Sequence, residues 1–187
     1  MYTIIQIIIG VAFITALALL IRRLVKIYVR YRGKMVVTCP ENQQPAGVEV
    51  DARYAAVTAT MEGENLVLKT CTRWPEMHDC GQECLAQIEN APEDCKVRNI
   101  LDHWFEDRSC IFCHKHFGHT HWHDHKPVLM NPEKSFREWN DIPVEKLPDF
   151  LKTHEAVCWD CFIAETFRRQ HPELVTDRPA NREHLIK

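Results

Sequence analysis

The segment that constrains this chain most is residues 2–21, a long apolar run without a charged side chain. As a helix rising about 1.5 Å per residue, it would reach about 30 Å, the thickness of the hydrocarbon core of a bilayer. A cleaved signal peptide has a basic segment before its apolar stretch and a small-residue cleavage site after it. No basic residue precedes this run, and Arg22 and Arg23 follow it directly. The sequence therefore predicts one uncleaved transmembrane helix.

The charge around this run predicts its orientation. Lys and Arg beside a membrane span are retained in the cytoplasm. The basic residues of the first 34 positions all follow the apolar run, and they are Arg22, Arg23, Lys26, Arg30, Arg32 and Lys34. We therefore expect the N-terminus outside and the rest of the chain in the cytoplasm. All 26 acidic residues lie beyond position 34. This acidic soluble part argues against nucleic acid as a partner, because phosphate binding depends on Lys and Arg.

Residues 1–34 are the predicted anchor and its basic flank. Residues 35–100, which follow, are expected to form a region of mixed structure. Three stretches rich in β-branched residues, KMVVTC, GVEVDARYAAVTAT and ENLVLKT, are separated by turn formers and predict a small antiparallel sheet. A short helix is expected from near Asp79 until Pro92 ends it, and a second short helix over residues 97–104.

Residues 101–176 contain two Cys-x-x-Cys pairs, a histidine-rich stretch, a short helix expected over residues 149–153, and a closing helix that stops before Pro172. Residues 177–187 are predicted to be a polar tail. So small a soluble part has a sparse apolar core, and bound metal would supply the missing folding energy. The predicted fold class is α+β, with one N-terminal transmembrane helix followed by a small zinc-stabilised domain.

Nine cysteines in a cytoplasmic domain favour metal ligation over disulfides, because the cytosol keeps thiols reduced. A two-residue gap lets two thiolates bind one ion from a tight turn, and two such pairs complete the tetrahedral shell that zinc prefers. The predicted first zinc site consists of Cys110, Cys113, Cys158 and Cys161. The simpler alternative is that these four cysteines are buried as small apolar side chains.

The first cysteine pair is followed by His114, so CIFCH is also formally a c-type haem attachment sequence. Haem attachment takes place outside the cytoplasm, however, and the second pair is followed by Phe162, which cannot bind haem iron. Haem-based electron transfer is kept as an alternative.

The remaining five cysteines form a second cluster along the chain: Cys39, Cys71, Cys80, Cys84 and Cys95. Any four of them could close a second tetrahedral site, and we favour Cys39, Cys71, Cys80 and Cys84. Cys80 and Cys84 are four residues apart on the expected helix and would share one face. An iron–sulfur cluster is an alternative, although the spacing matches neither ferredoxin pattern. Packing of buried thiols as small apolar groups is another.

The histidine-rich stretch lies between the two cysteine pairs. On a β-strand, His119, His121, His123 and His125 would project from one side, because side chains alternate with period two. Four imidazoles on one side could form a third site for zinc, copper or nickel. The alternative is a solvated polar strand with one or two structural histidines.

Three pieces of the C-terminal part resemble the HNH arrangement, a zinc-bearing treble clef. They are Cys110-x-x-Cys113, the stretch WHDHKP at residues 122–127, and Cys158-x-x-Cys161 with the helix that follows it. The resemblance implies a treble-clef-like fold for residues 101–176. It also implies that Asp124 would hold a divalent metal and that His125 would activate water against a phosphodiester. The family's further metal ligand corresponds here to Phe162, which cannot coordinate an ion, so we expect the fold without the nuclease activity.

The whole chain also resembles a group of bacterial membrane-anchored, Cys- and His-rich proteins, through its apolar helix, its VTCPENQ-type strand, its CTRWP segment and its paired cysteines. This resemblance implies a bacterial inner membrane and supplies no function. We expect a non-catalytic, membrane-tethered zinc-binding accessory or interaction subunit of a larger membrane complex, with other membrane-protein subunits as partners. The alternatives are an HNH-like metal-dependent nuclease, and a haem, iron–sulfur or metal-handling protein.

Overall fold

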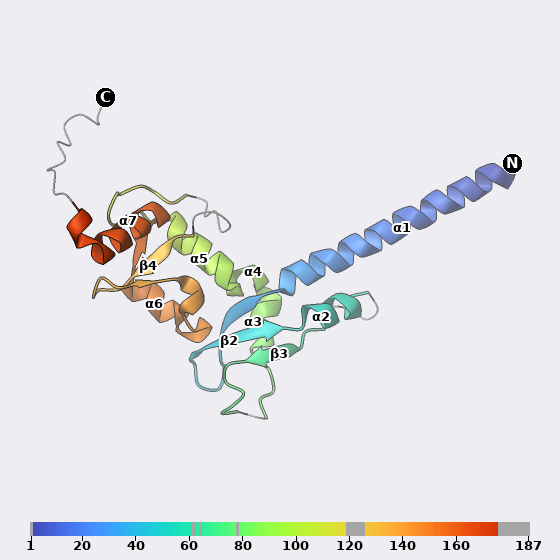
Figure 1. The fold of residues 1–187 in the computed structure, drawn as a ribbon. Coiled ribbons are helices and arrows are strands. Elements are labelled where there is room, and N and C mark those ends of the chain that lie inside the picture. The colour runs from blue at the N-terminus through green and yellow to red at the C-terminus, as the bar shows by residue number, and fades with distance from the viewer. Residues whose placement is uncertain (1, 61–62, 64, 78, 119–125, 176–187) are drawn as a thin grey trace. The chain divides into compact units, whose positions relative to one another are not determined.

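The computed structural model of the chain (Figure 1) describes residues 2–60, 63, 65–77, 79–118 and 126–175. The chain divides into two compact units. Unit 1 comprises Met1–Trp104 and Ile142–Lys152, and unit 2 comprises Phe105–Asp141 and Thr153–Lys187. The sequence predicted a boundary near residue 100 and placed residues 142–152 in the C-terminal module, whereas in the structure these residues belong to unit 1.

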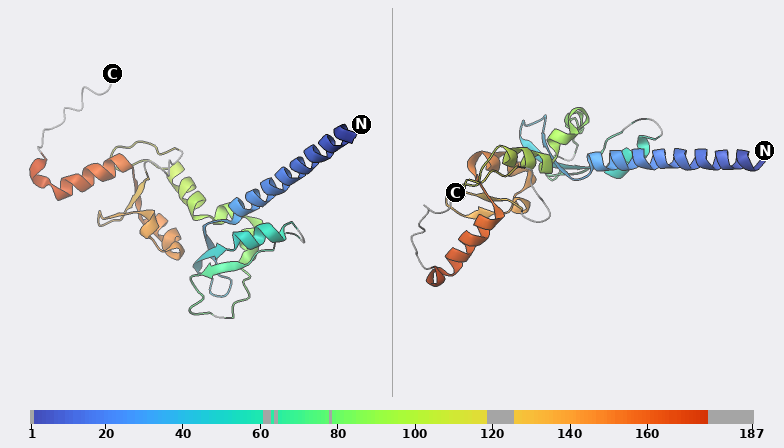
Figure 2. Two further views of the ribbon diagram at one scale, coloured as in Figure 1. Left: turned by 45° about the vertical axis from the view of Figure 1, so that its right-hand side comes forward. Right: turned by 90° about the horizontal axis from the view of Figure 1, so that it is seen from above.

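Unit 1 begins with α1, Tyr2–Tyr31, which contains the apolar run and continues through most of the basic flank as one helix. By length and composition α1 is able to cross a membrane. Its side chains are exposed throughout residues 2–21, and Figure 2 shows this part projecting away from the sheet in both views. Only the last turns are packed, where Ile27 and Tyr31 are buried in the core of unit 1. The helix is therefore attached to unit 1 through its C-terminal end.

The small antiparallel sheet expected after the anchor is confirmed. It consists of β1 (Lys34–Thr38), β2 (Pro45–Val50) and β3 (Leu68–Cys71), in the order β1-β2-β3. Met35 pairs with Val48, and Val48 pairs on its other side with Cys71. Met35 and Val37 alternate with more exposed residues, which gives β1 one buried face.

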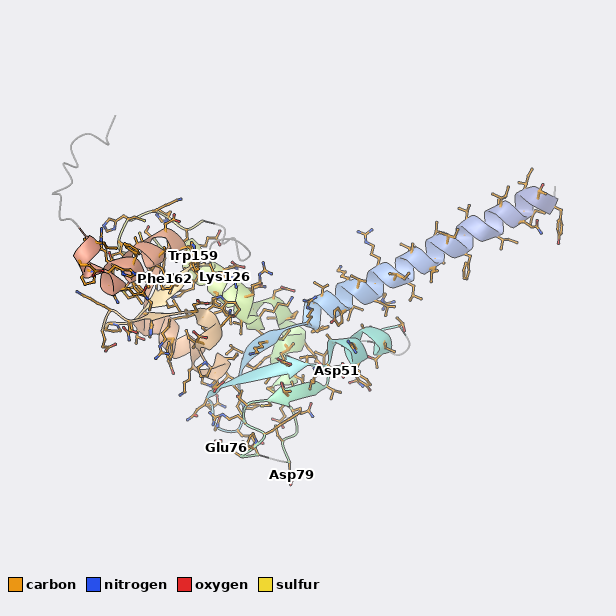
Figure 3. All side chains as sticks on the ribbon, viewed as in Figure 1. Asp51, Glu76, Asp79, Lys126, Trp159 and Phe162 are labelled. Carbon is orange, nitrogen blue, oxygen red and sulfur yellow. The ribbon has the colours of Figure 1, made fainter. Side chains whose placement is uncertain are left out.

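The expectation of a strand throughout GVEVDARYAAVTAT was wrong, because its second half forms α2, Ala52–Thr58. Asp51, labelled in Figure 3, caps this helix: its carboxylate accepts hydrogen bonds from the backbone N–H groups of Arg53 (3.1 Å) and Tyr54 (2.9 Å). Ala52, Ala55 and Ala56 are buried. Their small side chains let α2 pack closely against α1. Capping and this contact outweigh the local β-branched pattern.

Three helices follow the sheet: α3 (Leu85–Asn90), α4 (Pro92–Cys95) and α5 (Val97–Glu106). The second predicted helix corresponds to α5, whereas the first begins at Leu85 and not near Asp79. Gln82 has a φ of 58°, a left-handed conformation that cannot continue a helix. Cys80 therefore lies in the turn before α3, and the expectation that Cys80 and Cys84 share one helical face was wrong.

The segment 142–152 contains η2 (Val144–Lys146) and most of α6 (Leu147–Thr153), and η2 packs beside β2. The indole Nε1 of Trp104 donates to the carbonyl of Leu151 (2.9 Å), which helps to hold the segment in unit 1. The contact with β2 is close at Gly47, where a Cβ atom would lie 2.9 Å from Cβ of Val144 and 3.2 Å from Cγ2 of Thr72. Only glycine fits at this position without a shift of its neighbours.

We expect Gly47→Ala to lower the free energy of unfolding of unit 1 by about 1–3 kcal/mol, the usual cost of overpacking. Denaturant titration of the full chain in detergent, followed by hydrogen exchange of the β2 amides, measures this. Gly81→Ala is the control, because a Cβ there would meet only Cγ of Glu83, at 3.9 Å. Equal stability of the two variants would contradict the close approach at Gly47.

Unit 2 is built on a second antiparallel sheet that the sequence did not indicate. Its strands are β4 (Val128–Met130), β5 (Phe136–Arg137) and β6 (Glu155–Val157), in the order β5-β4-β6. Helix α7, Trp159–Gln170, follows β6 and confirms the predicted closing helix. Two short helical turns, η1 (Trp139–Asp141) and η3 (Pro172–Leu174), complete the unit.

Candidate metal centre

The first cysteine pair lies on a tight turn attached to β6. The N–H of His114 donates to the carbonyl of Cys110 (2.8 Å), and the N–H of Cys110 donates to the carbonyl of Lys115 (2.9 Å). His114 has a φ of 58°, which lets the chain reverse directly after the pair. The N–H of Ile111 donates to the carbonyl of Ala156 (3.0 Å). The turn is therefore fixed to the strand that leads into the second pair.

The second pair lies at the junction of β6 and α7. Cys158 is the residue that precedes α7, and its carbonyl accepts a hydrogen bond from the N–H of Phe162 (2.9 Å). Cys161 lies in the first turn of α7, which begins at Trp159. The partial positive charge at the N-terminal end of a helix favours thiolates there.

The fold brings all four cysteines of the predicted first site together. The sulfur atoms of Cys110, Cys113, Cys158 and Cys161 lie within 4.8 Å of one another, and within the described ranges they are the one such group of possible metal ligands. Cys113 Sγ and Cys158 Sγ are 3.7 Å apart. A tetrahedral shell with zinc–sulfur bonds of about 2.3 Å places its sulfurs about 3.8 Å apart. The donor set and this spacing fit a tetrahedral thiolate site.

Hydrogen bonds from the backbone prepare one of these sulfurs to be anionic. Cys110 is fully buried, and burial alone would raise the pKa of its thiol. Backbone N–H groups of Cys158, Cys113 and Phe112 outweigh burial and lower the pKa of Cys110 from 9.0 to about 7. The folded chain thus favours the thiolate. This contribution to stability is complete above pH 9 and is lost as the pH falls through about 7.

The pKa values of Cys161 and Cys158 are raised by burial and by the neighbouring sulfurs. Burial, together with the neighbouring sulfurs of the group, raises the pKa of Cys161. Burial and the sulfurs of Cys110 and Cys113 also raise the pKa of Cys158. Several thiolates so close together repel one another, and a divalent cation among them would remove this penalty.

Phe117, Phe136 and Phe162 pack against the buried cluster that contains Cys110. Phe162 packs against Phe136, with ring centroids 5.3 Å apart, and against Trp159, at 5.5 Å. Figure 3 shows Trp159 and Phe162 together at α7. The guanidinium of Arg169 lies over the ring of Phe136, 4.6 Å from its centroid. Sequence analysis missed Phe136 and Arg169, because they lie outside the cysteine pairs and only the fold brings them near.

In the second cluster, the surroundings of Cys95 differ from those of the other four cysteines. Burial, followed by the electrostatic effect of Cys71, Cys80 and Cys39, raises the pKa of Cys84 to about 11. Their sulfurs do not gather within 4.8 Å as those of the first site do. Cys95 is also buried, but its Sγ faces the carbonyl of Gln87 at 3.9 Å, and its pKa is raised by burial and by Asp94.

The predicted third site, and the residues to which the resemblance to HNH nucleases assigns catalytic roles, lie outside the described part of the chain. These residues are His119, His121, His123, His125 and Asp124. A metal site on these histidines and the carried-over roles of Asp124 and His125 stay predictions. Comparison with known proteins finds no matching family model, no similar curated protein and no similar solved structure.

Proposed function

We propose that this chain is a membrane-tethered zinc protein whose metal is structural, and that it serves as an accessory or interaction subunit of a membrane complex. The observation that carries the proposal is the group of four sulfurs from two separate parts of unit 2. A shell of four cysteines has no open position for water or substrate, which is typical of structural zinc and not of catalytic zinc. The metal would hold the Cys110–Cys113 turn to the start of α7.

Membrane attachment is supported by α1. A helix of 30 residues whose apolar side chains are exposed along residues 2–21 would be insoluble in water unless lipid covered it. The basic residues that follow favour a cytoplasmic position for both units, in a bacterial inner membrane. In that reducing compartment the cysteines would be available to metal.

A role in interaction is supported by the outer surface of α7. Ile163 and Phe167 are four residues apart on this helix, and each is about half exposed (48% and 49%). Residues with this spacing share one face of a helix. An exposed apolar pair next to a metal-fixed turn fits a contact surface for another protein better than it fits a reaction site.

Nothing in the described site favours the nuclease. The position that would supply the further metal ligand holds Phe162, and its ring is packed between Phe136 and Trp159. We expect the purified protein and its His125→Ala variant to behave alike when each is incubated with plasmid DNA and Mg²⁺. A cleavage activity lost in that variant would replace this proposal with the nuclease.

Metal analysis of the full chain, purified in mild detergent without chelator, tests the proposal. We expect at least one zinc per chain, a colourless protein, and loss of protected amides in β4 and β6 when a strong chelator removes the metal. Less than one zinc per chain, with these amides still protected in chelator, would contradict a structural zinc. A reporter fused after Lys187 tests the orientation, and activity on the outer side of the membrane would contradict the cytoplasmic position.

A further inference from the structure

Three segments of unit 1 carry the four favoured cysteines of the second cluster. Cys39 directly follows β1, Cys71 is the last residue of β3, and Cys80 and Cys84 lie in the turn that leads into α3. β1 and β3 both run antiparallel to the strand between them, so their C-terminal ends point the same way. The loops that leave these two strands therefore start toward the same end of the sheet.

The segment of Cys39 is fastened to that of Cys84. The side-chain amide of Gln87, in the first turn of α3, accepts a hydrogen bond from the N–H of Thr38 (2.9 Å) and donates one to its carbonyl (2.6 Å). Both backbone groups of the residue before Cys39 are thus bound to the helix that begins after Cys84. Such paired bonds fix the distance between the two segments.

The segment of Cys71 is fastened to both of the others. The guanidinium of Arg73 donates to the side-chain carbonyl of Gln44 (2.5 Å), in the loop that follows Cys39. The N–H of Leu68, at the start of β3, donates to the side-chain carbonyl of Gln82 (3.0 Å), in the turn between Cys80 and Cys84. The three segments are therefore joined pairwise, each bond lying within a few residues of a cysteine.

Two of these cysteines lie in turns that direct a backbone donor at the sulfur. The N–H of Arg73 donates to Cys71 Sγ (3.5 Å), and the N–H of Gln82 donates to Cys80 Sγ (3.4 Å). The first centre has the same feature, where the N–H of Cys158 donates to Cys110 Sγ (3.4 Å). Hydrogen bonds to sulfur stabilise the thiolate, which is the form that binds metal.

Simple apolar packing explains only part of this arrangement. Cys39 and Cys84 are buried (7% and 5% exposed) within the core of unit 1, as free cysteines often are. Packing does not account for N–H donors aimed at two half-buried sulfurs. Cys95 provides the contrast, because it is a buried thiol of the same unit, and its sulfur faces a backbone carbonyl instead.

We propose that Cys39, Cys71, Cys80 and Cys84 bind a second zinc ion, separate from the one in unit 2, and that Cys95 takes no part in it. This goes beyond the proposed function, which rests on the cysteines of unit 2 alone. The four sulfurs are less closely gathered than those of the first centre. Changes of staggered χ1 rotamer can move cysteine sulfurs without moving the backbone.

The test is the zinc content of the full chain in detergent. We expect two zinc ions per wild-type chain, one in Cys71→Ser and one in Cys80→Ser. Cys95→Ser is the matched control and is expected to keep both, because it makes the same substitution at a buried thiol of the same unit. Two ions retained in Cys71→Ser and in Cys80→Ser would overturn the proposal.

A measurement on the wild type guards against variants that simply fail to fold. Chains loaded with Co²⁺ are expected to show the thiolate charge-transfer absorption of two tetrahedral sites, with about half of that intensity left in Cys71→Ser. One equivalent of Co²⁺ or zinc in the wild type, lost in Cys110→Ser, would overturn the second site and leave the proposed function in place. Absence of bound zinc altogether would overturn both.

Discussion

Cys110→Ser is expected to remove one zinc ion per chain and to unfold unit 2. A serine hydroxyl does not ionise at neutral pH, so the substitution removes one thiolate from the shell and leaves a polar group at a fully buried position. Structural zinc supplies about 10–16 kcal/mol of apparent binding free energy to small domains. Cys110 is buried together with Met130 and Val157, so the loss of the metal would act directly on this part of the core.

Zinc content and hydrogen exchange together measure this effect. In Cys110→Ser we expect the amides of β4 and β6 to lose protection, while those of β1 and β2 in unit 1 keep theirs. The control is Cys95→Ser, which changes a buried cysteine of unit 1 and is expected to leave both zinc and unit 2 unchanged. If Cys110→Ser kept its zinc and its protected strands, the four-sulfur centre would not be what holds unit 2 together.

The second large effect is expected where the C-terminal end of α1 packs against the rest of unit 1. Tyr31, in the last turn of α1, is 2% exposed and packs in the same core as Met35 and Ile88. Truncation of a buried aromatic side chain costs about 3–5 kcal/mol. We therefore expect Tyr31→Ala to destabilise unit 1 by this amount, while α1 itself stays helical.

Tyr54→Ala is the matched control for this prediction, since Tyr54 lies on the neighbouring helix α2 and is 43% exposed. Its truncation is expected to change stability by no more than about 0.5 kcal/mol. Denaturant titrations of both variants in the same detergent, with hydrogen exchange of β1 as the local probe, separate the two. Similar losses in both would show that the anchor does not contribute to the core of unit 1.

Sequence alone predicted those features that are encoded by residues close together along the chain. The length and apolarity of residues 2–21 predicted α1, and the two-residue gaps predicted the grouping of Cys110, Cys113, Cys158 and Cys161. Helix α2 was missed because its stability comes from the Asp51 cap and from alanines that face α1, and the contact with α1 is tertiary. Strands β4 and β6 were missed because each is three residues long and pairs with a distant segment.

Membership of the second cluster depended even more on tertiary contacts. Spacing alone allowed any four of five cysteines. Cys95 differs from the others because its Sγ faces the carbonyl of Gln87. The side chains of Gln87, Gln82 and Arg73 join the segments that carry the other four cysteines. No periodicity or motif marks these residues as bridges. The left-handed turn at Gln82 likewise places Cys80 outside the predicted helix, so the shared helical face that favoured Cys80 and Cys84 as a pair is not formed.

The continuous course of α1 from the apolar run into the core of unit 1 determines how the sheet would stand at a bilayer. Residues 22–31 extend the helix about 15 Å past the apolar run at about 1.5 Å per residue, without an intervening hinge. A flexible linker would let the sheet tumble. Here Ile27 and Tyr31 of α1 are buried in the core of unit 1. A rotation of the helix about its axis would therefore rotate the sheet with it. A neighbouring transmembrane segment that rotated α1 would thereby change the direction in which unit 1 faces.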